Sequence, residues 1–343
     1  MSETTETRSS ETRTGETKPD AAPRRRLPAR LLHLLATQIE LRMLLLIIVV
    51  MAVLSRISPY FLTTNNLLNV MDQSVIAGMV ALGQTLVILI GGIDLSVGAL
   101  TGVSAIMLGL TFPKLGVPVA VLICLASGGA LGLVNGVIIT FGRIAPFVVT
   151  LGMMSIGRSM AYVLSGANSI GNIPDSLAAL TTDSVFGIPL DFLCLIVVYA
   201  IGWVFLTFAK GGRTLYAIGS NAEAARIAGL SINLWSITAY VVAGLMSAVA
   251  AVFLTSKILS IDPIGGSGEE LDSIAAVVIG GASLFGGRGS IIGTLAGVFI
   301  MVFIRNGLNL LNVSPYWQGT AIGSIIIAAV LVERLLSGGR SRA

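Results

Sequence analysis

The sequence has little charge, one histidine and two cysteines. Asp, Glu, Lys and Arg make up 11% of its 343 residues, whereas a soluble domain carries about a quarter. So few charged residues cannot cover a large water-facing surface, which argues against a soluble protein. Cys124 and Cys194 lie within apolar runs without motif spacing, so we expect no disulfide framework. No cluster of metal-binding residues surrounds His33, and we expect no metal site.

Apolar residues fill the chain instead. The hydrophobic fraction is 55% and the mean hydropathy is +0.92, and a helix needs about 20 apolar residues to span a bilayer. The sequence predicts an all-α fold, a polytopic transmembrane bundle of about ten helices embedded in lipid. The expected spans are 40–58, 67–90, 95–112, 117–140, 147–165, 191–209, 233–254, 272–284, 290–311 and 317–336. The eighth span is short, which is typical of a broken or half-buried helix.

The two ends of the chain are polar. Residues 1–22 are rich in Ser, Thr and Glu, and Arg24, Arg25, Arg26 and Arg30 follow them. We expect residues 1–35 to form a disordered cytoplasmic tail with a basic block, because this composition cannot bury a core. Residues 36–338 form the predicted transmembrane domain, and 339–343 a second cytoplasmic tail. No small-residue cleavage site follows the first apolar run, so it is predicted to be a retained helix.

The basic residues set the expected orientation. If the amino terminus lies in the cytoplasm and the chain crosses ten times, most loop Lys and Arg residues fall inside. They are Arg143, Lys210, Arg213, Arg226, Arg288, Arg334, Arg340 and Arg342. This bias follows the positive-inside rule and places both termini in the cytoplasm. The basic pI of about 9.3 then reflects membrane orientation, and we expect no nucleic acid partner.

Glycines lie within several apolar runs. Gly128, Gly132 and Gly136 recur every four residues, a spacing that allows close packing of helices in lipid. A weak internal echo relates residues 90–95 to residues 279–284, because each segment carries two glycines followed by a leucine. Duplicated halves are common in transporters, and the echo hints at such a duplication.

A polar segment at residues 212–230 lies between the sixth and seventh expected spans. Ser220 or Asn221 can cap a helix, and Glu223 then suits the positive end of the helix dipole. Alanines dominate residues 222–228, and Gly229 can end the helix. The segment therefore predicts a short surface helix that fits a groove on another protein.

A second polar segment joins the second and third spans. Gly91 and Gly92 can end one helix in a left-handed conformation, and Asp94 can cap the next helix. Asp94 could alternatively line a gate or contact a partner. No Gly-Lys-Ser/Thr follows these glycines, so the segment is not a phosphate-binding loop. Pro146 fits the first turn of the fifth helix.

Several polar residues fall inside the expected spans. Arg158 lies about 18 Å beyond Pro146 along a helix, past the bilayer centre, so it faces a cavity, reaches outward or pairs with an acid. Candidates for a translocation pathway are Asn69, Gln73, Gln84, Asn135, Arg158, Asn306 and Asn309. Packing between helices also explains the amides. Asp72 is the one carboxylate clearly placed within a span. The spans therefore carry no acidic relay, and this absence argues against ion-coupled transport.

These segments resemble one family. Glu223-Ala224-Ala225 and Gly229 resemble the EAA---G signature of ATP-binding-cassette (ABC) importer permeases, whose coupling helix docks into an ATPase. Residues 91–98 resemble the GGIDLSVG signature of ribose- and xylose-type monosaccharide importer permeases, and residues 145–152 and 219–232 resemble further segments of that family. Apart from about the first 35 residues, the resemblance runs along the chain.

The resemblance implies roles for the motif residues. The residues expected to couple to the ATPase are Ser220, Asn221, Glu223, Ala224, Ala225, Arg226 and Gly229, and those expected to act in gating are Gly91, Gly92, Asp94, Leu95, Ser96, Gly98, Pro146 and Thr150. The chain would catalyse no reaction and hold no cofactor, because ATP and Mg²⁺ would bind the ATPase.

The same resemblance implies partners and a location. It predicts a homodimer in the inner membrane, an ATPase on the cytoplasmic side and a sugar-binding protein outside. The outer loops at 166–190 and 255–271 would be solvated loops or the docking surface for that binding protein. The alternatives are an ion-coupled carrier and, with less support, an intramembrane enzyme or sensor. The identity of the sugar stays open.

Overall fold

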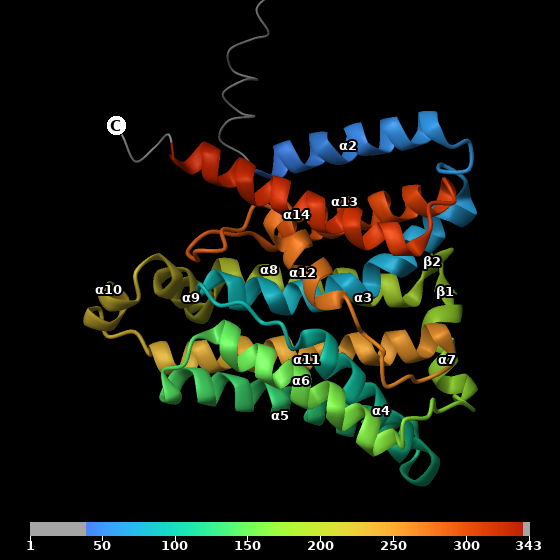
Figure 1. Ribbon diagram of the computed structural model, residues 1–343, viewed down its shortest axis with the longest axis horizontal. Coiled ribbons are helices and arrows are strands. Elements are labelled where there is room, and N and C mark those ends of the chain that lie inside the picture. Colours follow the sequence, from blue (N-terminus) through green and yellow to red (C-terminus); the bar gives the residue numbers. More distant parts are fainter. Residues whose placement is uncertain (1–38, 339–343) are drawn as a thin grey trace, which may run out of the picture. The chain divides into compact units, whose positions relative to one another are not determined.

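The computed structural model describes residues 39–338, and this part of the chain is a bundle of helices (Figure 1). The predicted tails at 1–35 and 339–343, and His33, lie outside the described residues. Each of the ten predicted spans corresponds to a helix in the described part. These helices are α2 (Ile39–Ile57), α3 (Thr64–Leu89), α4 (Val97–Leu115), α5 (Val117–Gly142), α6 (Pro146–Ser165), α8 (Leu190–Phe208), α11 (Ile232–Ile258), α12 (Glu269–Ile279), α13 (Ile291–Leu310) and α14 (Pro315–Gly338).

The expected membrane bundle is confirmed. Within residues 39–338, the seven helices α3, α4, α5, α6, α8, α11 and α13 are long and apolar enough to cross a membrane. α12 has 11 residues, which at ~1.5 Å per residue is about half of a bilayer core. The predicted span 272–284 is wrong at its carboxyl end, because Gly280 and Gly281 terminate α12 after Ile279.

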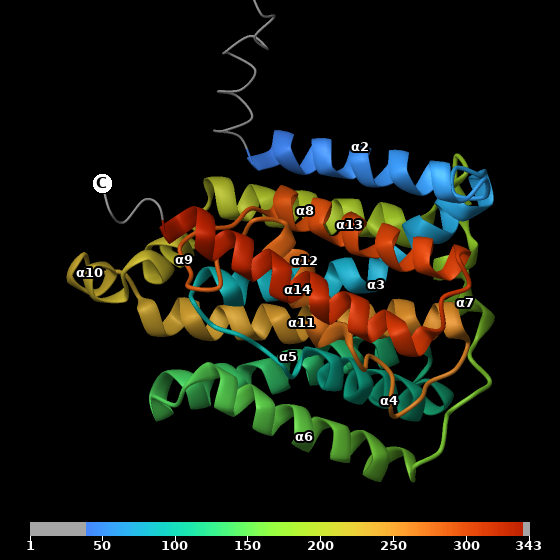
Figure 2. The same cartoon turned by 45° about the horizontal axis from the view of Figure 1, so that its top comes forward.

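Short elements lie at the two ends of the bundle (Figures 1 and 2). One end carries α7 (Asp175–Thr182) and a hairpin of β1 (Ser184–Val185) and β2 (Ile188–Pro189). The other end carries α9 (Lys210–Ser220) and α10 (Ala222–Ile227). The sequence predicted α10 but not α9.

Helix α3 occupies the centre of the bundle. Every residue from Gly78 to Leu89 is buried, as expected for a helix that is apolar all round and covered on all sides. One buried cluster joins α3 to α8 and α11. A second cluster joins α3 to α12 and α13, and a third lies among α4, α5, α6 and α11. α3 therefore connects the two sides of the bundle.

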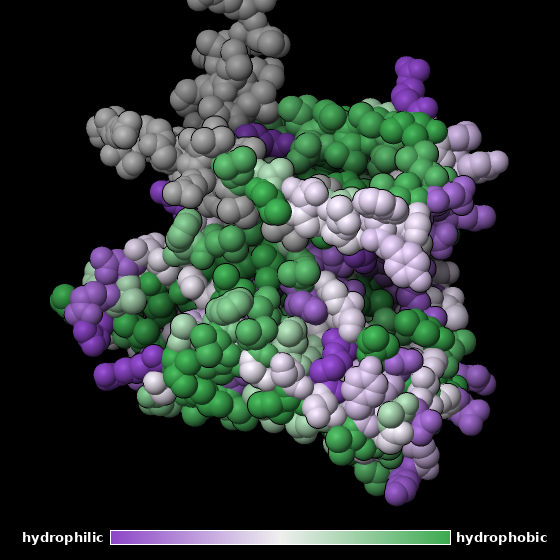
Figure 3. All heavy atoms as spheres, in the orientation of Figure 1, coloured by the Kyte–Doolittle hydropathy of each residue, from purple (hydrophilic) through white to green (hydrophobic). Residues whose placement is uncertain are grey.

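The outside of the bundle is strongly apolar. Val163 on α6, Leu122 on α5 and Ile201 on α8 expose 64–77% of their surface. Hydrophobic residues cover much of the visible surface, and hydrophilic residues interrupt it at the bundle ends and where α6 runs beside the segment before α12 (Figure 3). In water such a surface would drive aggregation, and in a bilayer it meets the acyl chains.

The glycine row of α5 lies against α11, as its spacing predicts. A Cβ atom on Gly132 would collide with the Tyr240 backbone carbonyl, and one on Gly128 would collide with the Gly244 carbonyl. A Cβ atom on Gly136 would also lie too close to the Ile237 backbone, at 2.9 Å from its Cα atom. Contacts at this distance are possible only because the glycines lack side chains.

We predict that Gly132→Val destabilises the bundle by about 1–3 kcal/mol, because overpacking forces α5 away from the α11 backbone. The measurement is the thermal unfolding midpoint of the purified protein, which should fall. Gly319→Ala on α14 is the matched control, since a Cβ atom there meets nothing within 4 Å. Equal midpoints for Gly132→Val and the unaltered protein would contradict the packing argument.

Candidate functional site

The short helix α10 has the local structure that the sequence predicts. The Asn221 side chain accepts a hydrogen bond of 2.9 Å from the Ala224 amide, and Gly229 adopts a φ of +77° after the helix. Of the two proposed caps, Asn221 is the one used, because Ser220 ends α9. Glu223 and Arg226 form an exposed ion pair, and the hydrogen bond from the guanidinium to Glu223 raises the pKa of Arg226.

Helix α9 fastens α10 to the bundle. The Tyr216 hydroxyl donates a 2.9 Å hydrogen bond to the Gly289 carbonyl, and Leu215 is buried. Gly219 has no room for a Cβ atom, because the Leu89 carbonyl and the Gly287 amide lie against it. Three glycines in α9 hid this helix from sequence reasoning, since glycine disfavours a helix interior.

The loops that follow α3 and α12 meet beside Gly219, which lies against Leu89 and Gly287. In the turns after α3 and α12, Gly91 and Gly281 adopt φ values of +78° and +87°. In each turn, two amides bond back to carbonyls of the last helical turn, which is the Schellman motif. The left-handed turn predicted at Gly91 is therefore confirmed. The echo between the two segments is offset by one residue, because Gly91 corresponds to Gly281 rather than to Gly280.

The segment between α3 and α4 contradicts one prediction. Asp94 does not cap α4, which begins at Val97 after Ser96. Its Oδ1 atom instead accepts hydrogen bonds from the Ser96 amide at 2.8 Å and the Ser96 hydroxyl at 2.6 Å. Asp94 thus closes a local turn two residues before the helix, as Asp side chains often do.

Three helices hold this segment in place. The Gln84 amide, in the orientation that satisfies both partners, bonds the Asp94 backbone N–H and C=O at 3.2 Å. Asn135 donates to the Ser96 hydroxyl at 2.9 Å, and Thr150 donates to the Ile93 carbonyl at 3.1 Å. The structure therefore brings two expected pathway residues to the expected gating motif, where they satisfy buried backbone and hydroxyl groups.

The remaining motif residues have defined places. Pro146 begins α6, as predicted. Gly98, in the first turn of α4, lies against the Gly266 carbonyl and the Glu270 side chain and has no room for a Cβ atom. Leu95 is half-buried within the segment.

Three further pathway candidates, Asn69, Asn306 and Asn309, border neither the cavity among α3, α11, α12 and α13 nor the groove beside α6. Asn306 exchanges two hydrogen bonds with Asn66, at 3.0 and 2.8 Å, and this pair joins α13 to α3. Asn69 is exposed. Asn309 accepts a hydrogen bond from Gln318 at 2.7 Å. The amides of Asn306 and Asn309 therefore connect helices.

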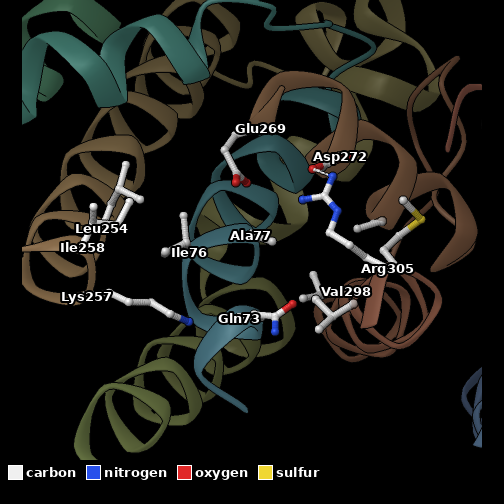
Figure 4. A pocket seen from close by; sticks show the side chains of 13 residues that line it. Gln73, Ile76, Ala77, Leu254, Lys257, Ile258, Glu269, Asp272, Val298 and Arg305 are labelled. Carbon is white, nitrogen blue, oxygen red and sulfur yellow. Dashed lines mark hydrogen bonds and ion pairs between the residues drawn. The ribbon is translucent and has the colours of Figure 1, made fainter. Parts of the chain in front are cut away.

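A cavity of about 230 Å³ lies among α3, α11, α12 and α13 (Figure 4). Its polar lining residues are Gln73, Lys257, Glu269, Asp272 and Arg305. Of the expected pathway residues, Gln73 alone borders it. The outer loop expected at 255–271 is shorter in the structure, because α11 ends at Ile258 and α12 begins at Glu269. Glu269 therefore lies on a helix beside the cavity, a position that the sequence did not predict. The segment before α12 folds into the bundle, where Gly266 packs against Gly98.

The charges in this cavity are partly paired. Arg305 donates to Asp272, and the pair joins α13 to α12. Glu269 has a buried Oε2 atom without a hydrogen-bond partner among the described residues. Gln73 is half-buried and Lys257 is exposed, and both border the cavity. The cavity therefore presents both donors and acceptors.

Arg158 lies on a different face. Its Nη1 atom lies 3.3 Å from the Pro263 and Gly265 carbonyls, so it supports the segment before α12. It borders a surface groove with Ser155, Ser159, Tyr162 and Glu270. Ser155, Ser159 and Tyr162 follow one another along α6 at intervals of four and three residues. They therefore share one helix face. α6 thus carries a polar stripe on an otherwise apolar outer surface.

We predict that Gln84→Leu lowers the free energy of unfolding by about 1–3 kcal/mol for each Asp94 backbone group that it leaves unpaired. Gln73→Leu should leave the unfolding free energy close to that of the unaltered protein, because Gln73 borders a cavity and supports nothing. Thermal unfolding of the two purified variants makes the comparison. A larger loss for Gln73→Leu would reverse the assignment of these two glutamines.

Comparisons with known proteins agree with this geometry. The family model described as branched-chain amino acid transport system / permease component matches residues 66–331. The chain is 38% identical over 307 residues to the ribose import permease protein RbsC of Haemophilus influenzae, covering 87% of this chain and 94% of that protein. It is 35% identical over 295 residues to the D-allose transport system permease protein AlsC of Escherichia coli, covering 84% and 90%.

A relative with lower sequence identity is named for the import of a different solute. The autoinducer 2 import system permease protein LsrC of Photorhabdus luminescens is 32% identical over 305 residues, covering 88% of this chain and 92% of that protein. No solved structure matches the chain. The matches span most of each relative, and the described residues form the membrane bundle expected of such proteins. The chain therefore belongs to the branched-chain amino acid transport system permease family, and it is a multi-pass protein of the inner membrane.

Proposed function

We propose that the chain is the membrane-spanning permease subunit of an ABC importer that carries a monosaccharide or a similar polyol. The observation that carries the proposal is the placement of α10. This helix stands at one end of the bundle with an exposed Glu223–Arg226 pair, and α9 anchors it to the turns that follow α3 and α12. The relatives named for ribose and D-allose transport support the sugar class.

A displacement of α10 would be transmitted to the centre of the bundle. Gly219 touches the Leu89 carbonyl and the Gly287 amide without an intervening side chain. Close-packed backbones transmit displacement because packed interiors resist compression. Leu89 ends the central helix α3, and the turn containing Gly287 leads into α13. Movement of α10 would therefore shift two helices that border the internal cavity.

The energy source would lie on a partner chain. The sequence carries no phosphate-binding loop, so ATP and Mg²⁺ would bind a separate ATPase that docks at α10. Lys210 and Arg213 on α9 and Arg226 on α10 are basic residues at this end of the bundle. They favour a cytoplasmic location under the positive-inside rule. Both termini would then lie in the cytoplasm.

A second copy of the chain would cover the polar stripe of α6. Arg158, Ser155 and Ser159 on this face have unfavourable contacts with lipid, and they border a groove of about 630 Å³ with Glu270. A homodimer that buries the stripe beside a water-filled path would satisfy these groups. We also propose that residues 91–98 act in gating. They are held by α5 and by α6, the helix that carries the polar stripe, through hydrogen bonds from Asn135 and Thr150.

The opposite end would receive a sugar-loaded binding protein. There the two outer loops pair with each other, because Ile170 and Ile261 exchange backbone hydrogen bonds of 2.8 and 2.9 Å. With α7 and the β1–β2 hairpin, they form a connected surface (Figure 1). Its polar and acidic residues suit a soluble protein partner.

One observation favours a second function. Glu269, Asp272, Arg305 and Lys257 line an internal cavity, and ionisable groups inside a membrane bundle are typical of ion-coupled carriers. An ion-coupled sugar carrier is therefore the alternative, and the energy source of uptake separates the two.

We predict that Glu223→Lys reduces sugar uptake at least tenfold, because the charge reversal removes the acidic first turn of α10 that the ATPase would contact. Stability should not change, since an exposed ion pair contributes little to folding. Uptake of radiolabelled sugar, normalised to the amount of permease in the membrane, is the measurement. Lys114→Glu reverses a charge at an exposed position of α4 and should transport normally. Normal uptake by Glu223→Lys would refute the coupling role.

We predict that a protonophore leaves uptake into vesicles nearly unchanged when ATP is supplied, whereas removal of ATP abolishes it. The physical reason is that the work is done by ATP binding and hydrolysis on the partner. Vesicles that contain the permease, its ATPase and its binding protein would be assayed under both conditions. Uptake that survives without ATP and collapses with the protonophore would establish the ion-coupled alternative instead.

A further inference from the structure

We propose that the cavity among α3, α11, α12 and α13 is a low-affinity binding site for a neutral polyhydroxylated solute, so that the permease itself selects among sugars. This inference rests on the proposed function for the chemical class of the cargo. It goes beyond it by assigning recognition to this chain, in addition to the binding protein.

The size of the cavity suits one small solute. Its volume is about 230 Å³, which is below the range of about 300–1,000 Å³ typical of sites for drug-sized ligands. A liquid water molecule occupies about 30 Å³, so the space exceeds that of a single ordered water severalfold. A monosaccharide or a cyclic polyol is a solute of this scale.

The lining offers both donors and acceptors. Glu269 and Asp272 present carboxylate oxygens, and Lys257 and Arg305 present N–H donors. Gln73 offers both kinds of group. Figure 4 shows the side chains of Glu269, Lys257, Gln73 and Arg305 directed toward a common space from four different helices. Sugar hydroxyls donate and accept, so such a mixed lining suits them.

The charges on the lining favour a neutral solute. The two carboxylates of Glu269 and Asp272 balance the two cations of Lys257 and Arg305, so the cavity has no formal net charge to neutralise an ion. Apolar side chains of Ile76, Ala77 and Val298 complete the wall. They can pack against the C–H face of a sugar ring, as is usual in pockets with a few placed polar groups.

Glu269 borders the cavity with a carboxylate that is not fully hydrogen-bonded. Its Oε2 atom is buried and has no partner within the described part of the chain, and an unpaired buried polar group is costly. The neighbouring Asp272 is already engaged by Arg305. Because Glu269 borders the cavity, a solute hydroxyl there could donate to its carboxylate without disturbing the existing ion pair.

The cavity is also bordered by the helices to which a displacement of α10 would be transmitted. Gln73 and the central helix α3 form one wall, and α12 and α13 form others. The carboxyl end of α3 and the turn between α12 and α13 touch Gly219 of α9. A solute held here would therefore be gripped by elements that α10 can move, and weak binding would allow its release.

The test is direct binding to the purified full-length permease in nanodiscs, without ATPase or binding protein. Radiolabelled D-ribose, D-allose, D-xylose, D-galactose and myo-inositol are the probes, each measured by equilibrium dialysis up to 100 mM. We expect saturable binding of at least one probe, with a dissociation constant on the order of millimolar. Glu269→Gln and Gln73→Leu should each weaken it at least tenfold.

Lys257→Gln and Lys114→Gln provide a matched pair. Both lysines are exposed and lie in the last turn of a long helix, but only Lys257 borders the cavity. The first variant should weaken binding and the second should not. Thermal unfolding midpoints check that each variant is folded. Glu269→Gln keeps the side-chain shape and breaks no hydrogen bond, so it should fold normally.

Three results would overturn the inference. They are no saturable binding of any probe, unchanged binding by both Glu269→Gln and Gln73→Leu, or equal weakening by Lys114→Gln and Lys257→Gln. None of these results bears on ATP-driven uptake, which is measured with the complete transporter. Loss of ATP dependence there would refute the proposed function while leaving the binding data to stand by themselves.

Discussion

The backbone contact at Gly219 is the constraint on which the rest of the structure depends. The Leu89 carbonyl, at the end of the central helix, accepts a 2.9 Å hydrogen bond from the Gly287 amide, and the backbone of Gly219 lies against both groups. Three segments far apart in the sequence therefore meet with no side chain between them. Because even one methyl group would separate them, the short helix α10 and the bundle centre behave as one mechanical unit.

Glycines without side chains also allow close backbone contacts elsewhere in the bundle. Gly132 and Gly128 let α5 approach α11, and Gly98 and Gly266 let the first turn of α4 approach the segment before α12. In lipid, apolar burial does not draw helices together as it does in water, so close van der Waals packing carries more of the association. The 40 glycines of the chain are consistent with that requirement at these crossings.

Much of the architecture could be predicted from the sequence because its signals are local. Runs of about 20 apolar residues define helices such as α5 and α8, and Asn221 with Gly229 marks the ends of α10. The internal cavity could not be predicted in this way. Glu269 and Asp272 follow a polar, glycine-rich stretch that reads as an outer loop, and only the fold shows that this stretch enters the bundle.

Some polar residues could likewise be assigned a role from the sequence, and others could not. Gln84 and Gln73 lie on the same helix and have the same chemistry, yet one bonds the Asp94 backbone and the other borders a cavity. Nothing near either residue in the sequence distinguishes them, because their partners come from other segments. The residues proposed to couple to an ATPase, in contrast, lie within ten consecutive positions, so their pattern could be recognised from the sequence alone.

The half-length of α12 has a consequence for how the bundle can move. The residues before it are not helical, and turn hydrogen bonds pair the Asp262, Ile264 and Gly266 carbonyls. Arg158 reaches from α6 to the Pro263 and Gly265 carbonyls, so one guanidinium takes the place of a missing helical turn. A motion that pulled α6 away from this segment would expose those carbonyls unpaired. Arg158 therefore ties α6 to the segment before α12, and separating the two costs these hydrogen bonds.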